Sequence, residues 1–124
     1  MPELVAQPIV GRIAFIQVDC RNPAGVAAFW GALLAVEIQE RVGQYVCLQP
    51  QHATAPGLCF QAVPEGKTSK NRVHLDIAVS DIDRAAHRVK ELGGGQVSPE
   101  DVEEHGWRYR VMTDPEGNEF CLTA

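Results

Sequence analysis

Short stretches in which apolar and polar residues alternate recur along this chain and predict β-strands. The clearest lies at the C-terminal end, where Pro115 pre-sets a turn and Gly117 or Asn118 can adopt the positive φ that the turn needs. Because side chains alternate faces along a strand, Phe120 and Leu122 share one face. The other face carries Glu119, Cys121 and Thr123. This pattern predicts a strand with hydrophobic core behind it and a cavity in front.

Two stretches carry apolar residues at helical spacing instead. Asn22 and Pro23 are typical of a helix start, as cap and first helical residue. The apolar stripe that follows is Val26, Phe29, Trp30, Leu33 and Leu34. The second helix is predicted to begin at Ser80, which forms a capping-box pattern with Asp83. It ends at the glycines 93–95, interpreted as a helix stop with slack in the chain. Its stripe is Ile82, Ala85, Ala86, Val89 and Leu92.

The strands and helices together form a β-α-β-β-β pattern that occurs twice. The strands are predicted at 12–20, 36–40, 44–49, 57–63, 72–79, 96–98, 107–113 and 118–123. The two halves also match in the spacing from the first strand to the helix, since Phe15 lies seven residues before Asn22 and His74 lies seven residues before Asp81. We therefore predict an α+β fold in a single domain over 1–124. After a loose lead-in over 1–8, it comprises module 1 (about 9–63), a linker (64–71) and module 2 (72–124).

Each module must bury one face of its sheet against a helix, and apolar strand positions mark that face. They are Ile16, Val18, Phe60, Leu75, Ile77, Val79, Phe120 and Leu122. The opposite faces carry Phe15, Gln17, Asp19, Cys59, Gln61, Val63, His74, Asp76, Ala78, Glu119, Cys121 and Thr123. We expect two curved mixed sheets, with the helices outside, to direct this second set at one concave surface. Such a mixture of polar and apolar groups is typical of a small-molecule pocket.

Composition and charge argue against some kinds of binding partner and some cellular locations. A net charge of −5 without a basic cluster argues against a nucleic-acid surface. The longest apolar run, 27–36, is too short to span a membrane, and the N-terminus lacks the features of a signal peptide. The cysteines show neither CxxC spacing nor a small disulfide framework. We therefore expect a cytoplasmic protein with four free thiols, Cys20, Cys47, Cys59 and Cys121.

The duplicated pattern, the strand RVHLDI at 72–77 and the closing turn and strand DPEGNEF at 114–120 resemble the vicinal oxygen chelate superfamily. That group contains glyoxalase I, bleomycin-resistance proteins and extradiol dioxygenases, and this chain is similar to its small bacterial glyoxalase-like domains from about Gly11 onward. In metal-using members the ligands lie on the first and last strand of each module. The resemblance places those positions at Phe15, Gln61, His74 and Cys121, of which only His74 is an ordinary ligand there. The resemblance therefore implies the fold and an incomplete metal-ligand set.

Several residues on the predicted pocket face carry alternative roles. His74 is a ligand or proton carrier, or a pocket-lining histidine bonded to Asp76 or Gln61. Glu119 is a general base with a raised pKa, or a carboxylate that lies at the solvent mouth or pairs with an arginine such as Arg108 or Arg110.

A cysteine, two aromatic residues and an acidic run near the predicted pocket have less specific expected roles. Cys121 is expected to fill space rather than act as a nucleophile. Trp107 and Tyr109 alternate on a strand and either line the pocket or join the core. The acidic run 100–104 is interpreted as a solvated loop that His105 and Gly106 allow to move over the pocket mouth.

Three functions follow as hypotheses. The first is a protein that binds or sequesters a small organic molecule through Phe15, Gln17, Gln61, His74, Asp76, Trp107, Tyr109, Glu119 and Cys121. The second is an enzyme, a glyoxalase-type lyase or isomerase or a dioxygenase-like one, with Glu119 as base and His74 as electrophile. The third is a homodimeric interaction module with a vestigial pocket. No cofactor is expected; a divalent metal is disfavoured, and its ligands would be His74, Glu119 and Gln61.

Overall fold

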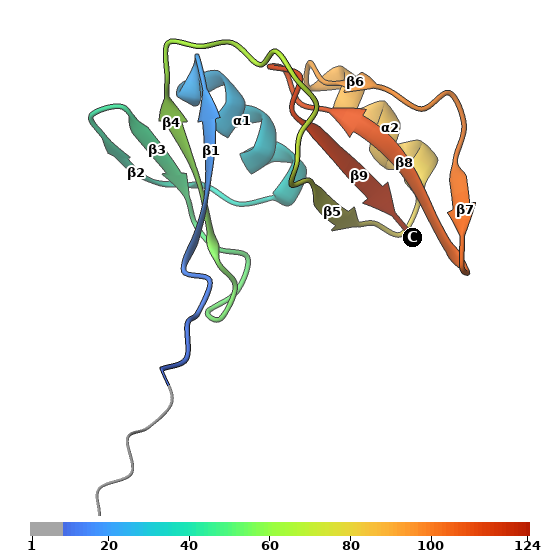
Figure 1. Ribbon diagram of the computed structural model, residues 1–124, viewed down its shortest axis with the longest axis horizontal. Helices are drawn as coiled ribbons and strands as arrows, with labels where there is room; N and C mark the ends of the chain where they lie inside the picture. The colour runs from blue at the N-terminus through green and yellow to red at the C-terminus, as the bar shows by residue number, and fades with distance from the viewer. Residues whose placement is uncertain (1–8) are drawn as a thin grey trace, which may run out of the picture.

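The computed structural model describes residues 9–124 (Figure 1), so the lead-in predicted at 1–8 lies outside the described residues. Module 1 contains β1 (Phe15–Cys20), α1 (Pro23–Leu34), β2 (Ile38–Val42), β3 (Tyr45–Leu48) and β4 (Gly57–Ala62). Module 2 contains β5 (Leu75–Ala78), α2 (Ile82–Glu91), β6 (Gly95–Gln96), β7 (Val102–Glu104), β8 (Trp107–Thr113) and β9 (Glu119–Thr123). The sheets have the orders β1-β4-β3-β2 and β5-β9-β8-β6, with β7 paired to β8. The predicted α+β fold of two βαβββ modules is confirmed.

The acidic run contains a strand where the sequence predicts a loop. β7 pairs antiparallel with β8, and Glu104 lies opposite Trp107 in the register. The two residues between them, His105 and Gly106, have φ values of 51° and 85°. Positive φ at both central residues is the geometry of a tight two-residue hairpin, which folds the acidic segment back onto β8. The prediction of a loop is therefore wrong for residues 102–104, although Glu103 and Glu104 are solvent-exposed as expected.

The two helices each begin at a capping side chain. The side chain of Asn22 accepts a hydrogen bond from the Gly25 amide at 3.2 Å, so the predicted cap of α1 is confirmed. For α2 the cap is Asp81, which accepts from the Arg84 amide at 3.1 Å. The predicted cap, Ser80, is one residue too early, because α2 starts at Ile82 and only Asp81 adjoins its first turn.

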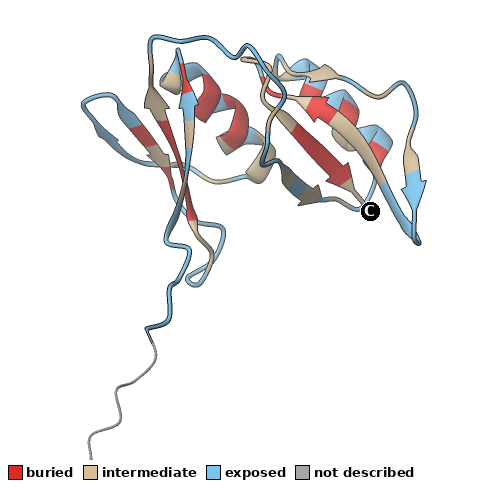
Figure 2. Ribbon diagram, viewed as in Figure 1, coloured by how far each residue is buried: buried red, intermediate tan, exposed pale blue. Residues whose placement is uncertain are grey.

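The core joins both modules. The strand positions predicted to face the helices all belong to one hydrophobic cluster or pack against it. Trp30 and Phe29 on α1 stack edge-on against Phe120 of β9, with ring centroids 4.7 Å and 6.1 Å apart. One helix therefore packs against its own sheet and also against the sheet of the other module. Figure 2 shows the buried positions gathered on these facing surfaces.

The turn before β9 fastens the two modules together. Asp114 is 2% exposed, and its carboxylate accepts a hydrogen bond from Trp30 Nε1 at 3.1 Å. It also accepts from the amides of Glu116 and Asn118 and from Asn118 Nδ2, at 2.9 to 3.0 Å. The Glu116 carboxylate accepts from the amides of Arg21 and Asn22 at 2.6 and 2.7 Å. The stretch predicted as a turn is thus also the polar link between module 2 and the start of α1.

Cys47 and Cys59 form a disulfide, which corrects the expectation of four free thiols. β3 and β4 are antiparallel neighbours, and their register places the two cysteines directly opposite each other. The sequence separation of 12 residues carries no sign of this, because only the sheet pairing brings the two sulfurs together. Cys20 and Cys121 are free and buried. No helix within residues 9–124 is long and apolar enough to cross a bilayer.

Candidate functional site

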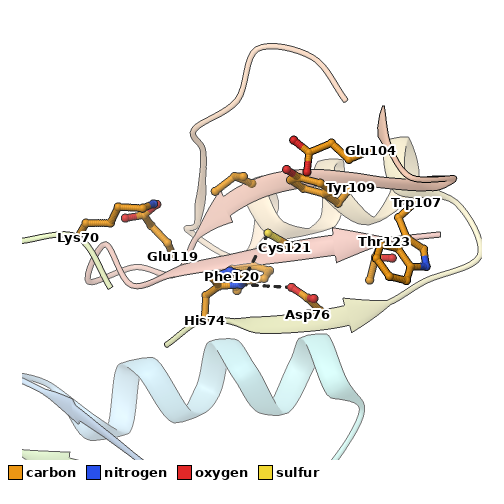
Figure 3. Close-up of a pocket in the computed structure, with 11 residues that line it drawn as sticks. Lys70, His74, Asp76, Glu104, Trp107, Tyr109, Glu119, Phe120, Cys121 and Thr123 are labelled. Atoms are coloured by element: carbon orange, nitrogen blue, oxygen red, sulfur yellow. Dashed lines mark hydrogen bonds and ion pairs between the residues drawn. The ribbon is translucent and has the colours of Figure 1, made fainter. Parts of the chain in front are cut away.

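A cavity of about 520 Å³ opens on the face of the second sheet that is turned away from the core. Its walls combine aromatic, charged and sulfur-containing side chains from β5, β7, β8 and β9 and from the end of the linker. They are Lys70, His74, Asp76, Glu104, Trp107, Tyr109, Val111, Glu119, Phe120, Cys121 and Thr123. Figure 3 shows His74 and Asp76 beside Cys121, with Trp107 at one end of the cavity and the Lys70–Glu119 pair at the other.

Strand parity places these groups on one face. β5 and β9 are parallel, and Asp76 lies directly opposite Cys121 in the register. His74, two residues before Asp76, and Glu119, two residues before Cys121, line the same cavity. The prediction that the imidazole and the neighbouring carboxylate share a face is confirmed.

The structure does not bring all nine predicted ligand-binding residues together. Six line the cavity described above: His74, Asp76, Trp107, Tyr109, Glu119 and Cys121. Phe15 and Gln17 line a second hollow of about 340 Å³ on the first sheet, beside Tyr45 and the disulfide. Gln17 also lines a third hollow of about 260 Å³ between the modules, together with His74 and Glu119. Gln61 lines none of these hollows. Because α1 packs against both sheets, their core faces share one interior, whereas Phe15 and His74 on the opposite faces line different hollows.

Three lining residues, Lys70, Glu104 and Val111, were missed by the analysis of the sequence, and Val111 follows Tyr109 on the same face of β8. Lys70 comes from the linker, where strand alternation carries no information about side-chain direction. Glu104 belongs to the acidic run and reaches the cavity only because β7 pairs with β8. Its place opposite Trp107 would have been found by reading His105-Gly106 as a hairpin turn.

Glu119 is held as a carboxylate by a neighbouring lysine. Lys70 Nζ lies 2.9 Å from Glu119 Oε2, and Lys67 Nζ lies 4.0 Å from Oε1. The hydrogen bond from Lys70 lowers the pKa of Glu119, partly opposed by burial, which is opposite to the raised pKa expected from the sequence. The expected arginine partners are engaged elsewhere, since Arg108 and Arg110 each donate to Asp101 at 2.6 Å. A carboxylate with a lowered pKa is a weak proton acceptor.

We expect this pairing to be visible in a titration. The carboxyl carbon of Glu119, followed by NMR, should titrate below the ordinary pKa of 4.5 and move towards it in a Lys70→Met variant. Because folding favours the charged form, the contribution of the pair to stability is complete above pH 4.5 and is lost as the pH falls through the lowered pKa. A Lys90→Met variant, which changes a lysine outside the cavity, is the control. A Glu119 pKa above 4.5 in the unmodified protein would contradict the assignment.

His74, Asp76 and Cys121 form a compact group on the floor of the cavity. His74 Nδ1 lies 3.2 Å from Asp76 Oδ1 and 4.0 Å from Cys121 Sγ. Burial, together with the charge of Asp76, raises the pKa of the Cys121 thiol, so the group is protonated when nothing is bound. A protonated, buried thiol is a poor nucleophile, as the sequence led us to expect.

A family model described as a glyoxalase-like domain matches residues 15–123. The chain belongs to the glyoxalase-like domain family. The match takes in both modules of this glyoxalase-like protein, from β1 to the end of β9. No curated protein sequence matches it significantly.

Solved structures share the fold of this glyoxalase-like protein at low sequence identity. A glyoxalase/bleomycin resistance protein/dioxygenase family enzyme from Burkholderia phytofirmans superposes with a TM-score of 0.77 at 17% identity, over 91% of this chain and 98% of the other. A glyoxalase-related enzyme from Fulvimarina pelagi gives 0.72 at 18% identity, over 92% and 88%. The fosfomycin resistance protein FosX from Listeria monocytogenes gives 0.73 at 13% identity, over 94% of each chain. At these identities the likeness establishes the fold.

The metal-ligand positions of the superfamily do not come together in this glyoxalase-like protein. Phe15 has no donor atom and is 62% exposed on the first sheet, and Gln61 lies outside all three hollows. His74 and Cys121 are the two positions of the four that lie close together. The residues present therefore do not fit a four-ligand centre shared between modules.

Proposed function

We propose that this protein binds a small organic molecule in the cavity of module 2. The observation that carries the proposal is the wall itself, in which two aromatic rings, Trp107 and Tyr109, lie beside a floor of polar groups. A concave site with apolar walls and a few converging polar side chains is the usual form of a ligand pocket. Trp107 is 70% exposed, so its ring is available to contact a ligand or another protein surface.

The charges on the wall favour a planar cation as the ligand. Three carboxylates, those of Asp76, Glu104 and Glu119, line the cavity, and Lys70 neutralises only Glu119. The two remaining carboxylates lie among the aromatic rings, whose faces also attract positive charge. The same arrangement disfavours an anionic ligand of similar shape.

Calorimetric titration of chelator-treated protein with two matched probes tests this proposal. We expect the cation 9-aminoacridine to bind and the anion acridine-9-carboxylate to bind at least about tenfold more weakly. Trp107→Ala should weaken 9-aminoacridine binding about 5- to 30-fold, as for the loss of a cation–π and stacking partner worth 1 to 2 kcal/mol. Val97→Ala, another exposed apolar position outside the cavity, is the control. Failure of both probes to bind, or equal binding to the Trp107→Ala variant, would reject the proposal.

The lowered pKa of Glu119 disfavours the lyase or isomerase alternative, because proton abstraction needs a more basic carboxylate. We therefore infer that Glu119 orients Lys70 at the cavity mouth. A Lys70→Met/Glu119→Gln double variant should keep its affinity for 9-aminoacridine within about threefold, since it removes a pair whose charges cancel.

We further propose that the binding form is a homodimer. Large apolar side chains are exposed on both outward sheet faces, Phe15, Val42 and Tyr45 on the first and Trp107 on the second. The hollow beside Phe15 is lined by module 1, and the cavity beside Trp107 is lined by module 2 and Lys70, so the module 1 face of one copy could cover the module 2 face of another. A two-fold axis makes that contact twice, which suits a duplicated architecture.

Light scattering coupled to gel filtration measures this assembly directly. We expect a dimer, and we expect Phe15→Asp to weaken it about 30-fold or more by placing a charge in the apolar contact. The exposed position Val97, outside both hollows, supplies the control Val97→Asp, which should remain dimeric. A monomer at high micromolar concentration would contradict the dimer without affecting the test of ligand binding.

A further inference from the structure

The floor of the cavity brings three different donor types within metal-binding distance. One ligand atom each of His74, Asp76 and Cys121 lies within 4.8 Å of the other two. For a tetrahedral zinc ion, bond lengths of 2.0 to 2.3 Å place neighbouring donors about 3.3 to 3.6 Å apart. The observed separations from His74 Nδ1, 3.2 Å to Asp76 Oδ1 and 4.0 Å to Cys121 Sγ, bracket that range. A movement of roughly 0.4 Å by the exposed imidazole of His74 would bring the longer separation into it.

We propose that His74, Asp76 and Cys121 form a three-ligand site for a thiophilic divalent cation such as Zn²⁺. One imidazole nitrogen, one carboxylate oxygen and one sulfur make up the mixed donor set that zinc accepts and that harder ions such as Mg²⁺ do not. The metal–sulfur bond forms as Cys121 releases its proton to solvent. The fourth position faces the cavity, where water or a donor atom of a bound molecule would complete the tetrahedron.

This site differs from the centre that the resemblance implies. Asp76 and Cys121 belong to the β5–β9 pair of module 2 and His74 directly precedes β5, so neither module 1 nor a second copy is needed to assemble the site. Asp76 is not one of the four superfamily positions, and it lies beside Cys121 because the two are register partners. Gln61 and Glu119, which the sequence suggested as ligands with His74, take no part, since Gln61 lies away from the cavity and Glu119 pairs with Lys70.

Accessibility also suits a metal that enters from solvent. The side chains of His74 and Asp76 are 50% and 61% exposed, whereas Cys121 is 5% exposed beneath them. Two mobile donors above one fixed sulfur can close around an ion without moving the sheet. The nearby carboxylate of Glu104 adds negative potential to the same cavity.

Cobalt titration tests the site without any organic ligand. Tag-free protein treated with chelator, and without reductant so that Cys47 and Cys59 stay paired, is titrated with Co²⁺ and then with Zn²⁺. We expect one equivalent of Co²⁺ to produce a sulfur-to-cobalt charge-transfer band and the intense visible bands of tetrahedral cobalt. One equivalent of Zn²⁺ should then abolish both sets of bands.

Variants identify the donors. Cys121→Ser should remove the charge-transfer band, and His74→Ala and Asp76→Asn should each weaken binding at least about tenfold. Cys20→Ser, which changes the other free cysteine, and Gln61→Ala should leave the spectrum and affinity unchanged. Circular dichroism confirms that each variant is folded. The proposal is overturned if the unmodified protein gives no charge-transfer band, if Cys121→Ser retains it, or if Gln61→Ala weakens binding as much as His74→Ala. None of these results bears on whether 9-aminoacridine binds to the metal-free protein.

Discussion

Replacing Asp114 with alanine is expected to lower the free energy of unfolding by at least about 3 kcal/mol. The substitution leaves four hydrogen-bond donors without their acceptor, among them the indole N–H of Trp30 and two backbone amides. Each buried donor left unpaired costs about 1 to 3 kcal/mol, and only those that water can reach will recover part of it. Urea denaturation followed by circular dichroism measures the change.

Two further variants provide reference values for the stability loss of Asp114→Ala. Trp30→Phe removes one of the four donors and keeps an aromatic ring in the core, so we expect a loss of about 1 to 2 kcal/mol. Asp81→Ala removes a helix cap that lies outside the link and should cost about 1 kcal/mol. If Asp114→Ala lowers the free energy of unfolding no more than Asp81→Ala does, the Asp114 carboxylate does not stabilise the contact between the modules.

Replacing Gly94 with alanine is expected to cost about 3 kcal/mol or more. A Cβ atom at this position would lie 2.5 Å from the carbonyl oxygen of Thr113, 2.6 Å from Cγ1 of Val89 and 3.0 Å from Cε2 of Phe29. The nearest of these atoms is backbone, so β8 itself would have to move away from the end of α2. Thermal and urea unfolding measure the loss.

Gly11→Ala is the matched control for this prediction, since a Cβ there would meet nothing within 4 Å. Its stability should change by less than about 0.5 kcal/mol. The triple glycine was interpreted from the sequence as slack after a helix. The structure shows instead that Gly94 permits the close approach of α2, β8 and the core ring of Phe29. A Gly94→Ala variant as stable as Gly11→Ala would restore the earlier interpretation.

The analysis of the sequence was most successful where the physics is local. Alternation along a strand assigned Phe120 and Leu122 to the core and Glu119 and Cys121 to the cavity, because the two faces of a strand are set by the backbone alone. The helix stripe containing Phe29 and Trp30 followed in the same way from the helical period. The duplication of these patterns was sufficient to predict two βαβββ modules.

Contacts between segments remote in the chain were decided by the tertiary structure. The disulfide depends on the register of β3 against β4, and the pairing of Lys70 with Glu119 depends on where the linker crosses the sheet. The lowered pKa of Glu119 follows from that pairing. The expectation of a raised pKa was wrong because it considered only the burial of the carboxylate on its strand.

The sequence by itself determined which side chains share a face of each strand, and hence the composition of the cavity floor in module 2. The tertiary structure decided that the core faces of the two sheets share one interior, because α1 lies against both sheets, and that Phe15 and His74 line different hollows. It also decided that Asp76 meets His74 and Cys121, since the parallel register of β5 and β9 aligns them. Alternation along the chain is a property of the backbone, whereas register and the packing of one module on the other arise only when distant segments meet.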